Sequence, residues 1–277
     1  MSKPFGLSLA ALAFAAILAA VEPAGATMEP YTPARQQPET THHRTDDALF
    51  GMETAPAFGE VSSKWLAVEA EIEHERTVLA GCDAGQACPA SAQELRRIIV
   101  EGAGRTGRAR VGLINRAVNL AITPTSDDVQ WGVADRWSPP LETLQTHRGD
   151  CEDYAIVKYA ALQEAGLPRD DMKIVILRNF VRNEDHAVLA ARVDGEWLIL
   201  DDRTLVLVPD AGMLGVHPVL ALDRDGAHRL VSPQQADQPV DGLTPPSLGR
   251  SIAAAKRDLA RRARDVSFER PDDRAKM

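Results

Sequence analysis

A single cysteine with three carboxylates beside it is the clearest chemical feature of the sequence. Cys151 lies between Asp150 and the pair Glu152-Asp153. Apolar residues at helical spacing predict a helix over 151–165, with Asp150 at its N-cap. The helix dipole favours a thiolate at this position, whereas the neighbouring carboxylates oppose it. A reactive Cys151 therefore needs a cationic partner, or a cation that neutralises these carboxylates.

A histidine and an aspartate in two later strands supply further candidates. His186 opens the apolar run 186–193, and Asp201 ends the run 197–201. The Asp194-Gly195 dipeptide between the runs is typical of a hairpin turn. Counting out from this turn places His186 and Asp201 roughly opposite each other at the open end, so that imidazole and carboxylate could touch. The order Cys, His, Asp fits a nucleophile, a general base and an orienting acid.

Two other residues compete for these assignments. His147 lies four residues before Cys151 and is a rival general base, ranked below His186 because no fixed element separates it from the cysteine. Asp202 competes with Asp201, since neighbours on a strand point to opposite faces and spacing alone does not choose between them.

The elements that position these residues change in type along the chain. Helices are predicted over 62–79, 91–103, 108–122, 141–146 and 151–165. Strands are predicted over 172–177, 186–193, 196–200, 205–208 and 219–222, with a short edge strand near 228–230. Helices followed by an antiparallel sheet indicate an α+β fold, in which the nucleophile helix packs on the sheet.

The two ends of the chain differ in composition from its middle. Residues 1–26 have a basic start, an apolar stretch and a small-residue cleavage pattern, which predict an export signal. Residues 27–60 are polar and read as a flexible leader. The remaining boundaries predict a folded domain over 61–231 and a charged, partly disordered tail over 232–277.

Cysteine number and charge limit the possible functions. In an exported protein we expect Cys82 and Cys88 to pair, which leaves Cys151 as the odd thiol. The two paired cysteines lack the second pair that a zinc site would need. A net charge of −9 without a basic stripe argues against a nucleic-acid partner. We expect a monomer.

Several of these segments together resemble a known family. The box 149–154, the strand starting at His186 and the strand ending at Asp201 resemble the bacterial transglutaminase-like cysteine peptidases, the family of the periplasmic adhesin-processing protease LapG. Further matching positions are Asn115-Arg116, Asn119, 131–133, Asp135, Trp137 and 139–144. The resemblance covers about residues 60 to 230.

The resemblance implies a papain-like or transglutaminase-core fold and a calcium-dependent endopeptidase in the periplasm. It selects Asp201 as the acid of the triad, and it places calcium at Asp150 and Glu152, with Asp153 as a weaker candidate. Without a metal, Asp150 would cap the helix and Glu152 would interact with its dipole. The implied partners are a protein substrate, such as a surface adhesin, and an inner-membrane LapD-like receptor.

Two other functions are compatible with the same residues. A transglutaminase or amidase would act on glutamine side chains or cell-wall peptides through the same thioester, and the acceptor, water or an amine, would decide the product. A calcium-responsive adaptor would keep the fold without the chemistry, although an intact set of Cys151, His186 and Asp201 argues against it.

Overall fold

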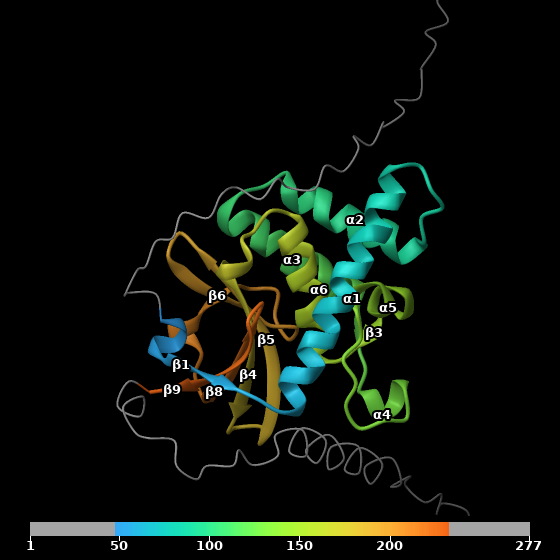
Figure 1. The fold of residues 1–277 in the computed structure, drawn as a ribbon. Helices are drawn as coiled ribbons and strands as arrows, with labels where there is room; N and C mark the ends of the chain where they lie inside the picture. The colour runs from blue at the N-terminus through green and yellow to red at the C-terminus, as the bar shows by residue number, and fades with distance from the viewer. Residues whose placement is uncertain (1–47, 233–277) are drawn as a thin grey trace, which may run out of the picture. The chain divides into compact units, whose positions relative to one another are not determined.

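The computed structural model describes residues 48–232, which form a layer of helices against one face of a seven-stranded sheet (Figure 1). The helices are α1 (Glu60–Asp83), α2 (Ala90–Ala103), α3 (Gly107–Ala121), α4 (Asp127–Gln130), α5 (Pro140–Thr146) and α6 (Cys151–Glu164). The predicted α+β class, with helices first and an antiparallel sheet second, is confirmed.

The large sheet has the order β1-β9-β8-β4-β5-β6-β7, and all its neighbouring strands are antiparallel. Its strands are β1 (Glu53–Ala57), β4 (Met172–Asn179), β5 (Glu184–Val193), β6 (Glu196–Leu200), β7 (Val208–Pro209), β8 (Val216–Asp223) and β9 (Gly226–Val231). A separate parallel pair joins β2 (Thr123–Pro124) to β3 (Arg148–Gly149), directly before α6. The pair therefore fixes the approach to the cysteine.

Helix α6 lies at the centre of the molecule, between the other helices and the sheet (Figure 1). Almost its whole surface is buried, because it packs against β5 on one side and against α2 and α3 on the other. Small residues at Ala155, Ala160 and Ala161 permit this close approach. A helix enclosed in this way holds the residue at its N-terminus, Cys151, in a fixed place.

The helical layer is joined by a disulfide and by one close contact. Cys82 and Cys88 form the predicted disulfide, which ties the end of α1 to the segment before α2. Helix α1 continues past residue 79, where the sequence predicted its end, and reaches Asp83. At Gly102 a Cβ atom would lie 2.5 Å from Ile114 Cδ1, so a larger residue would displace the Ile114 side chain between α2 and α3.

The prediction of a flexible leader over 27–60 is wrong for residues 48–60, the part that the structure describes. The short 3-10 helix η1 (Leu49–Gly51) packs on the outer face of the sheet, and β1 pairs along β9 from Glu53↔Val231 to Ala57↔Ala227. The sequence predicted an edge strand near 228–230, but β9 lies between β1 and β8 and is therefore not at the edge. Polar composition misled the prediction, because an outer strand such as β1 needs few apolar residues. Residues 1–47 and 233–277, including the predicted signal and tail, lie outside the described residues.

The predicted strand over 205–208 is also wrong. Residues 201–207 form a loop, and pairing with β6 resumes only at the two residues of β7. Asn119 Nδ2 donates to the carbonyls of Asp201 and Thr204 at 2.8 and 2.9 Å, so α3 replaces the sheet as the partner of this backbone. Asn115 and Asn119 therefore hold the loop that follows β6.

Glu75 gives the helical layer an unusual pH dependence. Its buried carboxylate accepts the Leu141 N–H at the start of α5, at 3.1 and 3.2 Å. Burial, with the charges of Glu71 and Glu142, raises the pKa of Glu75 to about 7 from 4.5, although the Leu141 N–H opposes this. The native state binds this proton more tightly than the unfolded state, so stability falls as the pH rises from about 4.5 to about 7.

We expect Glu75→Gln to remove this loss, because an amide oxygen still accepts the Leu141 N–H without a charge. The variant should be more stable than wild type by about 1–3 kcal/mol at pH 8 and nearly equal to it at pH 4.5. Urea unfolding of both proteins at the two pH values measures the difference. A gain of the same size at both values would contradict the assignment.

Candidate active site

The N-terminus of α6 presents Cys151 through a tight turn. A capping box joins Asp150 and Asp153, and the Asp153 carboxylate accepts the Asp150 N–H at 3.3 Å. The same carboxylate accepts the Ser138 N–H at 2.8 Å, which links the preceding loop to the helix. A Cβ atom at Gly149 would lie 2.6 Å from Asp153 Oδ2, so glycine is required in this box. Asp150 is the helix cap, as the sequence predicted.

The thiol of Cys151 lies against strand β5. The Ala187 N–H donates to Sγ at 3.4 Å, and the apolar neighbours of the cysteine are Ile176, Ala187 and Leu220. Sγ itself donates to Glu152 Oε2 at 3.1 Å. The backbone of the residue directly after His186 therefore contacts the sulfur, so the predicted nucleophile and base lie on adjoining elements.

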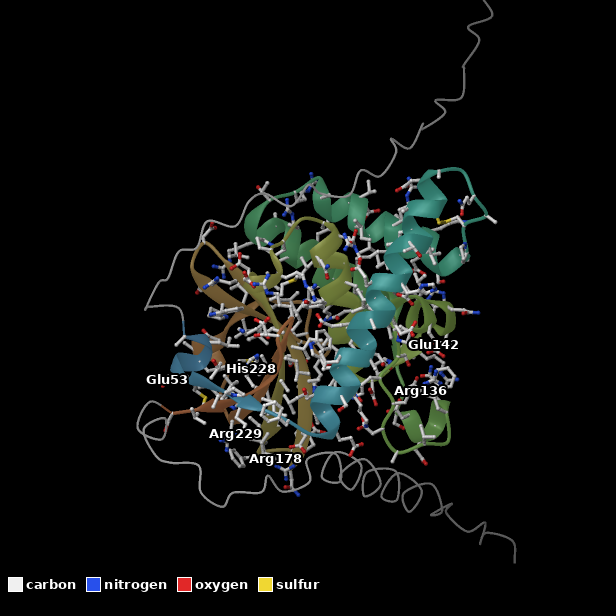
Figure 2. All side chains as sticks on the ribbon, in the orientation of Figure 1. Glu53, Arg136, Glu142, Arg178, His228 and Arg229 are labelled. Atoms are coloured by element: carbon white, nitrogen blue, oxygen red, sulfur yellow. A yellow bond between two sulfur atoms is a disulfide. The ribbon has the colours of Figure 1, made fainter. Side chains whose placement is uncertain are left out.

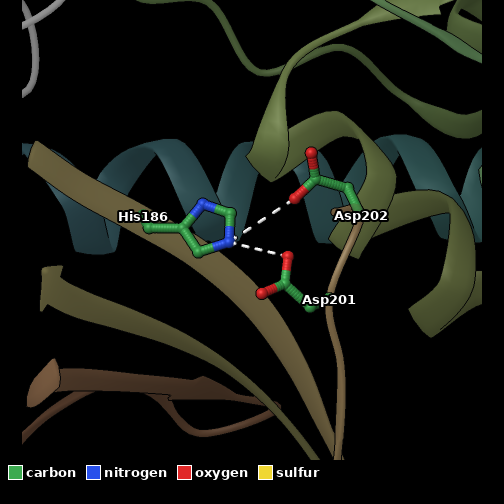
Figure 3. Close-up of side chains that lie close together, drawn as sticks. All are labelled: His186, Asp201 and Asp202. Carbon is green, nitrogen blue, oxygen red and sulfur yellow. Dashed lines mark hydrogen bonds and ion pairs between the residues drawn. The ribbon is translucent and has the colours of Figure 1, made fainter. Parts of the chain in front are cut away.

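His186 contacts both candidate acids (Figure 3). Its Nε2 lies 2.9 Å from Asp201 Oδ1 and 3.5 Å from Asp202 Oδ1, and its side chain is only 3% exposed. The predicted contact between His186 and Asp201 is confirmed. Asp202 reaches the same atom because β6 ends at Leu200, so the two aspartates lie in a turn rather than on opposite faces of a strand.

The two aspartates respond to this environment in opposite directions. Burial alone would raise the pKa of Asp201, but the hydrogen bond and charge of His186 outweigh it and lower that pKa well below its usual range. Burial raises the pKa of Asp202, and the charge of Asp201 adds to this, against the attraction of His186 and Lys158. Asp201 is therefore the more strongly ionised acceptor for the imidazole.

A second group of carboxylates surrounds the start of α6 on the side of the preceding loop. Ligand oxygens of Asp127, Asp135 and Glu152 lie within 4.8 Å of one another, and so do those of Asp127, Asp150 and Asp153. We call these five residues the carboxylate cluster. Burial raises the pKa of Asp153 well above its usual range, and the charges of Glu152 and Asp127 add to the effect. Lys64 brings one positive charge to the cluster, at 2.5 Å from Asp135.

The loop that carries Asp127 and Asp135 is fixed by Arg136. Its backbone N–H donates to Asp127 Oδ2 at 2.5 Å, and its guanidinium lies 4.2 Å above the ring of Trp131. Figure 2 shows Arg136 beside Glu142, and their side chains form an ion pair at 2.7 Å. The cluster is thus a built feature of the fold. Sequence reasoning singled out Asp150 and Glu152 but missed Asp127 and Asp135, whose only signal was an aspartate-rich loop.

All donors in the carboxylate cluster are oxygens, which are the ligands that calcium prefers. Three of the five residues, Asp127, Glu152 and Asp153, are buried. Buried carboxylates at this spacing repel one another, and a divalent cation would offset that repulsion. The donor set therefore fits calcium. His186, Asp201 and Asp202 satisfy the same spacing, but the buried ammonium of Lys158 interacts with both aspartates and opposes a cation there.

Three other residues singled out in the sequence lie elsewhere. His147 has a left-handed backbone (φ 52°), and its Nδ1 contacts the Ala121 carbonyl at 3.1 Å and Glu94 at 3.6 Å. Those contacts direct it toward α2 and α3. Trp137 is buried in the core, whereas Trp131 is partly exposed beneath Arg136. Trp137 is therefore a core residue.

The fold and this geometry define a class of protein. A cysteine at the N-terminus of a central helix, next to an antiparallel strand that carries a histidine, is the arrangement of a transglutaminase-like cysteine peptidase. Residues 82–209 match the family model described as bacterial transglutaminase-like cysteine proteinase BTLCP. This segment belongs to that family, and the protein is a cysteine peptidase. No curated protein matches the sequence.

Several solved structures are similar to the chain. LapG of Legionella pneumophila has 22% identity and a TM-score of 0.47, and the match covers 56% of this chain and 84% of LapG. A calcium-bound form has 20% identity and a TM-score of 0.47, with coverage of 68% and 98%. An EGTA-treated form has 19% identity and a TM-score of 0.46, with coverage of 74% and 99%.

Proposed function

We propose that the protein is an exported, calcium-dependent cysteine endopeptidase whose catalytic residues are Cys151, His186 and Asp201. One observation carries this proposal. The imidazole of His186 is held at Nε2 by Asp201, 2.9 Å away, while the next residue of the same strand contacts the sulfur of Cys151. Nucleophile, base and acid thus come from three separate elements, α6, β5 and the end of β6.

The contacts of His186 indicate which nitrogen acts as the base. Asp201 accepts a hydrogen bond from Nε2–H, and this selects the tautomer that leaves a lone pair on Nδ1. Nδ1 is buried and has no hydrogen-bond partner among the described residues. In the proposed reaction Nδ1 takes the proton of the Cys151 thiol. An imidazole whose other nitrogen is fixed in this way can do so without reorienting.

The remaining steps follow from thiol chemistry. Cys151 Sγ attacks the carbonyl carbon of the scissile peptide, and the imidazolium of His186 protonates the departing amine. Water then hydrolyses the thioester, with His186 as the base again. We assign one oxyanion donor to the backbone N–H of Cys151, in the first turn of α6, where the helix dipole also favours negative charge.

Calcium would be held by Asp150 and Glu152, and Asp127 in the preceding loop has ligand spacing with each of them, joined by Asp135 on the side of Glu152. Asp153 is less suited because its two oxygens already accept backbone N–H groups of Ser138 and Asp150. Bound there, the cation supplies positive charge that offsets the carboxylates next to the thiol. Those carboxylates are the ones that oppose formation of the thiolate.

The substrate and location rest on the family resemblance. We propose that the protein works in the periplasm after removal of residues 1–26, that it cuts a surface protein such as a large adhesin, and that an inner-membrane LapD-like receptor regulates it. None of the helices within residues 48–232 has the length and hydropathy needed to cross a bilayer. We propose that the domain acts as a monomer.

Digestion of the organism's exported proteins tests the proposed function. The purified protein is incubated with them in calcium and in chelator, and products are identified by mass. New protein termini in the calcium arm are expected.

A second pair of samples contains an added primary amine, because a transglutaminase would attach the amine to glutamine side chains. Amine adducts without cleavage would show that the protein is a transglutaminase and not a peptidase. If the Cys151 thiol does not react with iodoacetamide at neutral pH, the result favours the calcium-responsive adaptor.

Calcium should also stabilise the folded protein independently of catalysis. At about 100 times its Kd, calcium is expected to add roughly 2.7 kcal/mol to the free energy of unfolding. We expect Glu152→Gln and Asp127→Asn each to lose most of this gain, measured as the calcium-dependent rise in the thermal midpoint. Glu196→Gln, which changes an exposed carboxylate paired with Arg108, is the matched control and should retain it. An unchanged rise in both cluster variants would place calcium elsewhere.

A further inference from the structure

A lysine is buried on the helix that carries the cysteine. Lys158 lies on α6, one helical turn after Tyr154 and about two turns after Cys151. Its side chain is 0% exposed, in the middle of the apolar core. Lysine is almost never fully buried without a partner, because removing an ammonium from water is costly. The position therefore requires an explanation in terms of what the ammonium contacts.

The hydrogen bond of Lys158 and the two carboxylates that act on it lie at the end of β6. Its Nζ donates to the Leu200 carbonyl at 3.3 Å, directly before the two aspartates that approach His186. The charges that act on it are those of Asp202 and Asp201, and the ring of Tyr154 lies 5.8 Å from Nζ. Asn119 binds the next carbonyl, that of Asp201, at 2.8 Å. Helices α6 and α3 thus hydrogen-bond to consecutive carbonyls, those of Leu200 and Asp201.

Electrostatics support the same pairing. Burial lowers the pKa of Lys158 to about 7, although both aspartates act to raise it. The attraction of Lys158 in turn lowers the pKa of Asp202, against the burial and the Asp201 charge that raise it. The ammonium and the two carboxylates therefore depend on one another for their ionised forms.

We propose that Lys158 is a positioning residue of the peptidase site, whose buried ammonium neutralises Asp202 and fixes the end of β6 so that Asp201 stays directed at His186. This inference rests on the proposed function of the triad. The side-chain interaction between the two aspartates acts to raise the pKa of Asp202 and to lower that of Asp201. Without Lys158, a protonated Asp202 would donate its O–H to Asp201 and compete with the imidazole Nε2–H for that carboxylate.

Lys158→Met shortens the side chain by only one atom and removes its charge. We expect kcat to fall by about 10- to 100-fold with KM changed less than about twofold, since the substrate does not touch Lys158. Lys173→Met is the matched control: Lys173 pairs with Asp223 on the sheet and should leave kcat unchanged. Loss of kcat in both variants, or in neither, would overturn the proposal.

Nitrogen NMR of the His186 ring tests the mechanism without catalysis, in protein that also carries Cys151→Ala. The Nε2–H tautomer is expected in the parent protein and a mixture of tautomers after Lys158→Met. Adding Asp202→Ala to Lys158→Met removes the competing donor and should restore the single tautomer, and it provides a second variant should the first one unfold. A ring signal that Lys158→Met leaves unchanged, or that Asp202→Ala does not restore, would overturn the role of Lys158. Failure of the wild type to cleave any protein would instead refute the proposed peptidase chemistry of the triad.

Discussion

Replacing Cys151 by alanine is expected to abolish peptide cleavage, with a loss of at least about 10⁴-fold in kcat. No other group in the site can form the thioester, since Glu152 and Asp150 are carboxylates held at the helix start. The substitution removes one sulfur from a contact with Ile176, Ala187 and Leu220. We expect the fold to tolerate this small loss of volume. The measurement is cleavage of a substrate found among the exported proteins, with the thermal midpoint as a check on folding.

The other two cysteines provide the control for Cys151→Ala. Changing both Cys82 and Cys88 to alanine removes the disulfide between α1 and α2, which lies in a different part of the helical layer. That double variant should lose stability while its kcat stays within a fewfold of wild type. Equal cleavage by wild type and Cys151→Ala would remove the catalytic assignment of this residue.

The second large effect should separate two neighbouring aspartates. Asp201→Ala is expected to lower kcat by about 10²- to 10⁴-fold, because the imidazole of His186 loses the acceptor that fixes its tautomer. Asp202→Ala should lower kcat by less than about tenfold. The reason is geometric and electrostatic: Asp201 lies 2.9 Å from Nε2 and has the lowered pKa, whereas Asp202 lies 3.5 Å away and has the raised one.

These two alanine variants control for each other, since both shorten a partly buried side chain in the same turn. Steady-state kinetics on one peptide, with unfolding curves for both proteins, gives the comparison. Equal losses would mean that the carboxylates act as one unit, and a larger loss for Asp202→Ala would exchange their roles.

Much of this site could be predicted from local sequence patterns. The spacing of apolar residues after Cys151 specified a helix, and Asp150 specified where it begins. A two-residue hairpin turn fixes the register of its strands, so counting from Asp194-Gly195 brought His186 and Asp201 to the same open end, where their side chains meet beyond the last pair, Leu189↔Leu200. Both inferences depend on residues close together in the chain, where a few local rules determine geometry.

The parts that the sequence did not reveal depend on contacts between distant segments. Asp127 and Asp135 belong to the carboxylate cluster only because Arg136 and Asp153 fold their loop against α6. Lys158 lies among apolar residues, and its partners come from a turn 42 residues further along. Asp202 reaches His186 because the chain turns directly after β6 ends at Leu200, and apolar patterning does not indicate the shape of that turn.

The strand that precedes the helices has a practical consequence. By pairing with β9, β1 covers a row of backbone N–H and C=O groups at the margin of the sheet. A recombinant fragment beginning at Glu60 would leave that row open, and an open row of this kind recruits strands from other molecules. Soluble preparations should accordingly begin before Leu49, which also retains the apolar cover that η1 gives to the outer face.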